Sequence, residues 1–193
     1  MYLFAILSVL LLAGCVGSSI RYSNVLAKPE EKFKGFNVIY LENDLIAKNH
    51  NTASIVSIGY NDLPELMRER VPIIMQEYDL VGECESVKKV YFSDEIKAKA
   101  VKWSKANPAN LPLLIIQVTG GTALRYQAST AFYLDTQASL FNANQFSRIW
   151  TAQLSTNLGI SPLVRDGFDN KYVDQLLRTI FKQMKDDGLL LAK

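Results

Sequence analysis

The chain has 193 residues, of which 49% are hydrophobic and 21% are charged, a balance typical of a packed globular protein rather than a disordered or fibrous one. Its 21 Lys and Arg residues nearly offset its 19 Asp and Glu residues, so no general positive field would attract nucleic acid or a membrane surface. This length is enough for one domain of ordinary size.

The first fifteen residues have the pattern of a targeting signal. Residues 1–13 form an uncharged apolar run that is too short for the roughly 20 residues of a spanning helix but fits a signal peptide. The run ends in Leu12-Ala13-Gly14-Cys15, which resembles the lipobox of bacterial lipoproteins. This resemblance implies that the Cys15 thiol is diacylated, that the bond between Gly14 and Cys15 is cleaved, and that residues 1–14 are removed as a signal peptide.

The signal departs from the usual pattern because residues 1–4 contain no Lys or Arg. The alternative is a buried amino-terminal helix with an ordinary core cysteine, but an apolar strip without a polar face suits such a helix poorly. Val16, rather than Asp, follows the cysteine, which resembles the sorting pattern for the outer membrane. The implied location is the bacterial outer membrane, with the protein facing the periplasm.

Residues 15–35 are predicted to be a flexible tether because they are mostly polar and include Gly17-Ser18-Ser19 and Pro29-Glu30-Glu31-Lys32. About twenty flexible residues have a root-mean-square reach of roughly 25 Å, which would hold a small domain just clear of a bilayer. A single globular domain is then expected at residues 36–193.

The first half of this domain is predicted to contain strands and a proline-bearing helix. Residues 36–41 are rich in β-forming side chains and predict a strand, and residues 54–58 suggest a second. Asp62 and Glu65 fit the start of a helix that stops at Gly82. Pro72 lies inside this helix and is expected to kink or break it, because it removes an amide donor.

The second half is predicted to be richer in strands. Residues 87–92 suggest a strand and residues 94–105 a short helix, while the nearly all-apolar segment 113–118 is typical of a central strand covered on both faces. Residues 129–141 alternate in polarity and should pair with residues 148–154 through a turn at 142–144. An amphipathic helix capped by Asp169 should follow and end at Gly188.

This order of elements predicts an α/β (α+β) fold, with helices covering a mixed sheet of about four to five strands and a carboxy-terminal amphipathic helix on the sheet. The order resembles the small envelope lipoproteins related to the TolB amino-terminal domain. The resemblance rests on these segments: Leu80-Val81-Gly82, Leu114-Ile115-Ile116, Arg148-Ile149-Trp150 and Lys185-Asp186-Asp187-Gly188-Leu189-Leu190. It implies a non-catalytic domain that docks on partner proteins.

The sequence contains no pattern typical of a catalytic or metal site. Both the Gly-x-Ser-x-Gly elbow and the phosphate loop are absent, and Gly120-Gly121 is better explained as a turn or bulge that needs positive φ. His50 is the only histidine, which leaves at most one imidazole for a zinc cluster or a Ser-His relay. No catalytic residue, metal or cofactor is therefore predicted.

Two other features have alternative interpretations. Cys84 would lack a disulfide partner once Cys15 is lipidated, and its neighbours Glu83 and Glu85 oppose thiolate formation, so a passive thiol is expected. A basic cluster could meet lipid headgroups or an acidic partner, although a solvated helix face explains it more simply. The cluster comprises Lys88, Lys89, Lys97, Lys99, Lys102 and Lys105.

The sequence thus predicts a non-enzymatic envelope lipoprotein that binds or assembles with another envelope protein. The expected partners are the membrane, through the lipid anchor, and a protein; nucleic acid is not expected, and oligomer formation is compatible with this function. Two alternatives stay open. An envelope hydrolase would need a cleft with perturbed carboxyl groups, and a carrier of apolar ligands would need an internal cavity.

Overall fold

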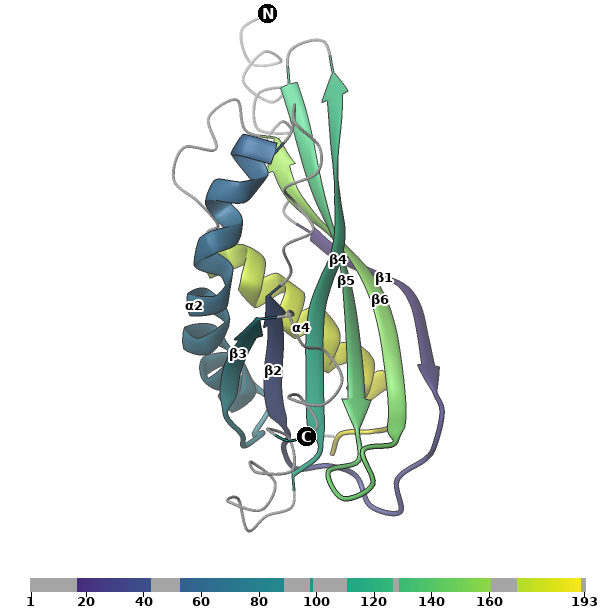
Figure 1. Cartoon of the computed structure of the whole chain (residues 1–193). Coiled ribbons are helices and arrows are strands. Elements are labelled where there is room, and N and C mark those ends of the chain that lie inside the picture. Colours follow the sequence, from purple (N-terminus) through teal and green to yellow (C-terminus); the bar gives the residue numbers. More distant parts are fainter. Residues whose placement is uncertain are drawn as a thin grey trace, which may run out of the picture.

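The computed structural model describes residues 17–42, 53–88, 98, 111–126, 129–160 and 170–191. These residues form one six-stranded mixed sheet with two long helices packed on one of its faces (Figure 1). The predicted fold class, a mixed sheet covered by helices with a carboxy-terminal helix, is confirmed, and the described sheet has six strands rather than four or five.

The sheet has the strand order β1-β6-β5-β4-β2-β3. The strands are β1 (Gly17–Val25), β2 (Asn37–Glu42), β3 (Cys84–Lys88), β4 (Leu113–Tyr126), β5 (Ser129–Phe141) and β6 (Arg148–Ile160). The helices are α2 (Ala53–Glu77) and α4 (Asn170–Asp186). β2 runs parallel to β3 and β4, whereas the pairs β4–β5, β5–β6 and β6–β1 are antiparallel.

The main core lies between the sheet and the two helices. Alternate residues of each strand face the helices, as Tyr40, Leu114 and Trp150 do, and α4 contributes Ile180 and Phe181 to the same cluster. The intervening residues of β2 and β4 form a second apolar cluster on the outer face of the sheet. The start of β4 is therefore buried on both faces, as its nearly all-apolar sequence predicts, and β2 is buried on both faces as well.

The predicted tether is wrong, because residues 17–25 form β1 at an edge of the sheet. β1 pairs with β6 from Gly17 opposite Asn157 to Val25 opposite Trp150. An edge strand with one face toward solvent needs few apolar residues, so its sequence resembles that of a polar linker. The folded domain therefore includes β1 and does not start near residue 36.

The predictions for the start of α2 are also wrong. The helix begins at Ala53, so residues 54–58 are not a strand and Asp62 lies inside the helix rather than at its start. The helix also continues through Pro72 without a break and ends at Glu77. An internal proline costs roughly 3 kcal/mol, but fully burying each of Val71, Ile74 and Met75 contributes roughly 1.5–3 kcal/mol, which offsets that cost.

Several other predictions can be compared with the described strands. The strand at 129–141 is confirmed as β5, and the predicted strands at 113–118 and 148–154 continue further, to Tyr126 and Ile160. β3 starts at Cys84, three residues before the predicted strand, and ends at Lys88. Residues 89–97 and most of the predicted helix at 94–105 lie outside the described residues, as does Asp169.

The predictions for glycine are partly confirmed. Gly188 has φ of 77° just after α4, as expected for a residue that ends a helix. Gly120 and Gly121 adjoin an irregularity in the pairing of β4 with β5, which confirms a bulge, but neither is among the residues with positive φ. α2 ends at Glu77 rather than running to Gly82, and Asp79, just after it, lies in the left-handed region at φ of 55°.

Candidate interaction surfaces

Most of the predicted site residues lie outside the part of the chain that the structure describes. These are Gly14, Cys15, His50 and the basic cluster apart from Lys88, which ends β3. Their roles stay predictions. The described residues nevertheless show how Cys84, the buried polar groups and the exposed apolar side chains are arranged.

Cys84 begins β3 and packs, partly buried, against the main core. Burial raises the pKa of its thiol to about 12, Glu85 also raises it, and Arg68 lowers it. The thiol is therefore protonated at neutral pH, which agrees with the prediction of a passive cysteine. The prediction explained the protonated thiol by the flanking carboxylates, whereas burial is the larger cause of its raised pKa.

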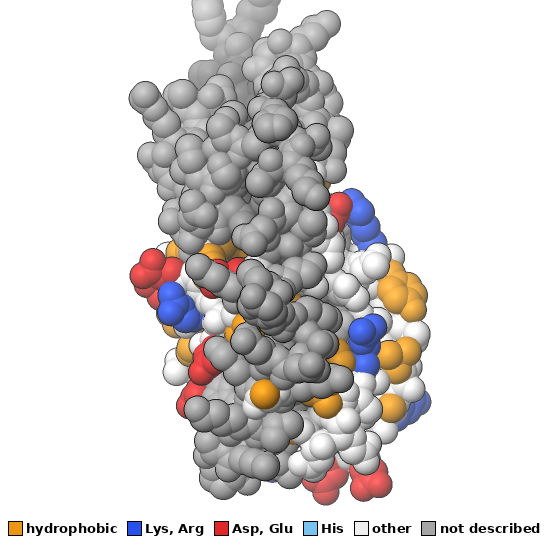
Figure 2. All heavy atoms as spheres, in the orientation of Figure 1, with side chains coloured by type: hydrophobic (Ala, Val, Ile, Leu, Met, Phe, Trp, Pro, Cys, Tyr) orange, Lys and Arg blue, Asp and Glu red, His pale blue; other side chains and the backbone are white. Residues whose placement is uncertain are grey.

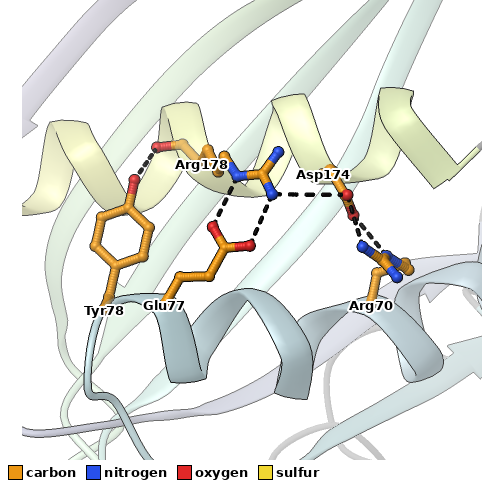
Figure 3. A network of polar contacts seen from close by, with 5 residues as sticks. All are labelled: Arg70, Glu77, Tyr78, Asp174 and Arg178. Atoms are coloured by element: carbon orange, nitrogen blue, oxygen red, sulfur yellow. Dashed lines mark hydrogen bonds and ion pairs between the residues drawn. The ribbon is translucent and has the colours of Figure 1, made fainter.

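A polar network joins α2 to α4 (Figure 3). Arg70 donates two hydrogen bonds to Asp174, from Nε to Oδ1 and from Nη2 to Oδ2, each 2.6 Å long. Arg178 donates in the same way to Glu77 at 2.8 and 2.7 Å, and the Tyr78 hydroxyl donates to the Arg178 carbonyl at 3.2 Å. The partners lie at least 100 residues apart in the sequence, so no local pattern predicts these contacts.

The network stabilises the helix pair, and both of its carboxylates are held in ion pairs with arginine. The hydrogen bonds from Arg178 lower the pKa of Glu77, although burial opposes the shift. The hydrogen bonds to Asp174 likewise raise the pKa of Arg70. Each carboxylate is held in a bidentate pair with a guanidinium group, which is a structural arrangement and not a general acid or base at a cleft.

The structure explains Asp187, a carboxylate at the unfavourable carboxy-terminal end of a helix. Trp150 has a fully buried ring, and its Nε1 donates a hydrogen bond to Asp187 Oδ2 at 2.6 Å. Gln183 donates to the other carboxylate oxygen at 2.9 Å. Asp187 therefore satisfies an indole N–H group that would otherwise be buried without a partner. The adjacent Asp186 pairs with Lys182, one helical turn earlier.

The described residues show no metal centre and no spanning helix. No three His, Cys, Asp or Glu side chains in this part of the chain are grouped so that they could bind a metal ion. None of the helices described here is both long enough and apolar enough to cross a membrane. A cavity beneath α4, lined in part by Leu63, Val118 and Leu176, has a volume of about 10 Å³, room for about one water molecule.

One candidate surface is the polar part of the outer sheet face, on β1, β6, β5 and β4. Arg21 lies 3.0 Å from both Asp135 and Ser155, so the charges in this group balance. A row of uncharged polar side chains crosses the strands beside it, formed by Tyr22, Gln153, Gln137 and Gln117. In Figure 2, the described surface on the right-hand side of the molecule shows separate hydrophobic, basic and acidic patches among white areas.

The second candidate surface is an open groove of about 460 Å³, here called the end groove. It is lined by Phe33, Lys34, Tyr78, Asp79, Leu80, Val81 and Leu191. Val81 is 58% exposed and Leu191 48% exposed, although both are large hydrophobic residues. Three segments meet here, since Phe33 bridges to Leu190 and Gly35 bridges to Val81.

Two glycines hold these segments close together. A Cβ atom at Gly35 would lie 2.0 Å from the Val81 carbonyl oxygen, and one at Gly82 would lie 1.9 Å from that of Phe36. Gly82 also has φ of 154°, which side chains disfavour. The backbone around the end groove is therefore closely packed and formed in advance of any binding.

No family model matches the chain, and no curated protein matches it. Similar solved structures include the PelC dodecamer from Paraburkholderia phytofirmans, with 13% identity, a TM-score of 0.41, and coverage of 91% of this chain and 99% of that one. The hypothetical protein CT253 from Chlamydia trachomatis has 11% identity, a TM-score of 0.43, and coverage of 82% and 100% respectively.

Lipoprotein GNA1162 from Neisseria meningitidis is also similar, with 12% identity, a TM-score of 0.38, and coverage of 78% of this chain and 99% of that one. One of the similar structures is thus that of a bacterial lipoprotein. The predicted resemblance to the TolB amino-terminal domain stays a prediction.

The pKa of Cys84 predicts slow alkylation of the folded protein. With a pKa of about 12, roughly one thiol in ten thousand is a thiolate at about pH 8. Iodoacetamide should label Cys84 slowly in buffer and at the rate of an ordinary thiol in concentrated guanidinium chloride, as followed by mass spectrometry. Glu85→Gln should change the folded rate little, because burial is the main cause, and rapid labelling of the folded protein would contradict this.

The Arg70–Asp174 pair predicts a measurable coupling energy between α2 and α4. Arg70→Gln and Asp174→Asn should each destabilise the protein, and the double variant should lose less than their sum, with a coupling of about 1–2 kcal/mol. Urea unfolding of all four proteins measures this. The exposed pair Lys182–Asp186 is the control, for which no coupling should be resolved; equal results for the two pairs would refute the prediction.

Proposed function

We propose that this chain is a lipoprotein of the bacterial envelope, anchored through lipid on Cys15 in the outer membrane and facing the periplasm, that acts by binding another envelope protein. The end groove is the observation that carries the binding function, because it leaves large apolar side chains in water on a preformed backbone. Such exposed apolar surface on a folded domain is typical of sites where proteins associate.

The end groove lies far from the proposed anchor. Gly17, two residues after Cys15, is level with Tyr133 on β5, through its pairing with Asn157. The end groove adjoins the start of β2, which is level with Phe141 of β5 through Leu113. These two levels are eight residues apart along β5, or about 26 Å. A protein anchored at Cys15 can therefore present the end groove away from the bilayer.

Anchoring also lowers the affinity that the end groove needs. A lipid anchor confines the domain to one membrane surface and raises its local concentration beside partners held at the same membrane. A groove with a few exposed apolar side chains is then enough for specific binding. This supports a binding module whose own contact surface is small.

The proposed anchor predicts that processing depends on Cys15. The native chain, expressed in a bacterial host, should lose residues 1–14 and gain the mass of the attached lipid, whereas Cys15→Ala or globomycin treatment should leave the full-length precursor. Intact mass spectrometry of membrane fractions distinguishes these species. An unchanged mature mass under both conditions would remove the lipoprotein proposal.

The binding proposal predicts crosslinks that are specific to the end groove. A photoreactive phenylalanine analogue in place of Val81 should give a discrete adduct with an envelope protein in intact cells, and Leu191→Asp should remove most of it. The matched control is the same analogue in place of Ile73, which is 45% exposed on α2 outside the groove. Equal adducts at both positions, or none at Val81, would overturn the proposal.

A further inference from the structure

We propose that the outer end of the β4–β5 hairpin contacts the interface of the membrane that holds the lipid anchor. We call this part the hairpin arm, and it comprises Gly120–Tyr126 of β4 and Ser129–Tyr133 of β5. The proposal rests on the lipidation of Cys15 proposed above. It adds a second point of contact with the same membrane.

The strand register places the hairpin arm beyond the start of β1. Gly17 pairs with Asn157, and Asn157 pairs with Tyr133. From Tyr133, β5 extends four more residues to Ser129, which pairs with Tyr126. At about 3.3 Å per residue, the hairpin arm reaches about 13 Å past the level of Gly17. Figure 1 shows this end of β4 and β5 projecting beyond α2.

This distance exceeds what the chain between the anchor and the sheet can span. Cys15 is two residues before Gly17, and two residues extend at most about 7 Å. When the strands stand along the bilayer normal, the hairpin arm therefore reaches at least about 6 Å further toward the membrane than Cys15 does. Groups that lie in the interface are commonly buried there by about 5–10 Å, so the arm reaches the required depth.

The residue types of the hairpin arm suit a lipid interface. The arm includes Leu124, Arg125, Tyr126, Phe132 and Tyr133, and its sequence contains one basic residue and no acidic one. Aromatic residues concentrate at membrane interfaces, and arginine favours anionic headgroups.

The opposite end of the sheet has a different composition. The turn between β5 and β6 contains Asn142, Asn144, Gln145 and Phe146, and the segment that leads from β1 to β2 carries exposed Glu30 and Glu31 as well as exposed Lys28, Lys32 and Lys34. Carboxylates and amides favour water over the interface. The two ends of the sheet therefore differ in that the hairpin arm lacks the carboxylates that the opposite end carries. An anchor at Cys15 and a contact at the hairpin arm would together hold the domain upright, with the end groove facing the periplasm.

Fluorescent labelling of the lipidated full-length protein tests the proposal. Tyr126→Cys is labelled with an environment-sensitive fluorophore and reconstituted into vesicles of phosphatidylethanolamine and phosphatidylglycerol; Cys84 reacts little because its thiol is protonated. We expect blue-shifted emission that nitroxide-labelled lipids quench. Asn144→Cys at the opposite turn is the matched control and should stay unquenched. Ser129→Cys provides a second arm position if Tyr126→Cys fails to fold.

The outcomes separate this proposal from the one on which it rests. An unquenched label on the hairpin arm, together with a lipidated Cys15 in the intact mass, would overturn the arm contact and leave the anchor standing. Quenching at both Tyr126→Cys and Asn144→Cys would show a domain lying flat and would also overturn it. A Cys15 without lipid mass would overturn both proposals.

Discussion

Burial of one sheet face beneath α2 and α4 is the interaction on which the rest of the structure depends. Tyr40, Leu114, Trp150 and Ile180 are fully buried there, and each fully buried large side chain contributes roughly 1.5–3 kcal/mol. This burial offsets the cost of Pro72 inside α2 and fixes which residues of every strand face inward. It also places Trp150 where its indole nitrogen needs Asp187 as a hydrogen-bond acceptor.

The charged groups follow from that packing. Once α2 and α4 lie side by side on the sheet, Arg70 meets Asp174 and Arg178 meets Glu77 across the two helices. On the outer face, Arg21 meets Asp135 between strands β1 and β5. These carboxylates therefore stabilise the packing of the helices and the sheet. The end groove, formed where three chain segments meet, is instead a candidate interaction surface with exposed apolar side chains.

β1 changes how the proposed anchor would work. A flexible tether would let the domain move freely at some distance from the bilayer, whereas a strand that starts at Gly17 would fix the sheet close to it. The sheet then has one end near the membrane, with the hairpin arm, and a distant end with the end groove. The proposed binding function depends on the orientation of the domain relative to the membrane. A short link between anchor and sheet fixes this orientation, whereas a long flexible tether does not.

Local patterns in the sequence by itself determined the inner strands near 113–118 and 129–141, the apolar stripe of α4 and the glycine, Gly188, that follows its last turn. Tertiary structure alone decided β1, whose polar sequence is a strand only because β6 lies beside it, with Gly17 opposite Asn157. It also decided the extent of α2, the ion pairs between helices and the end groove. These features join residues distant in sequence, and no neighbouring residues encode such contacts.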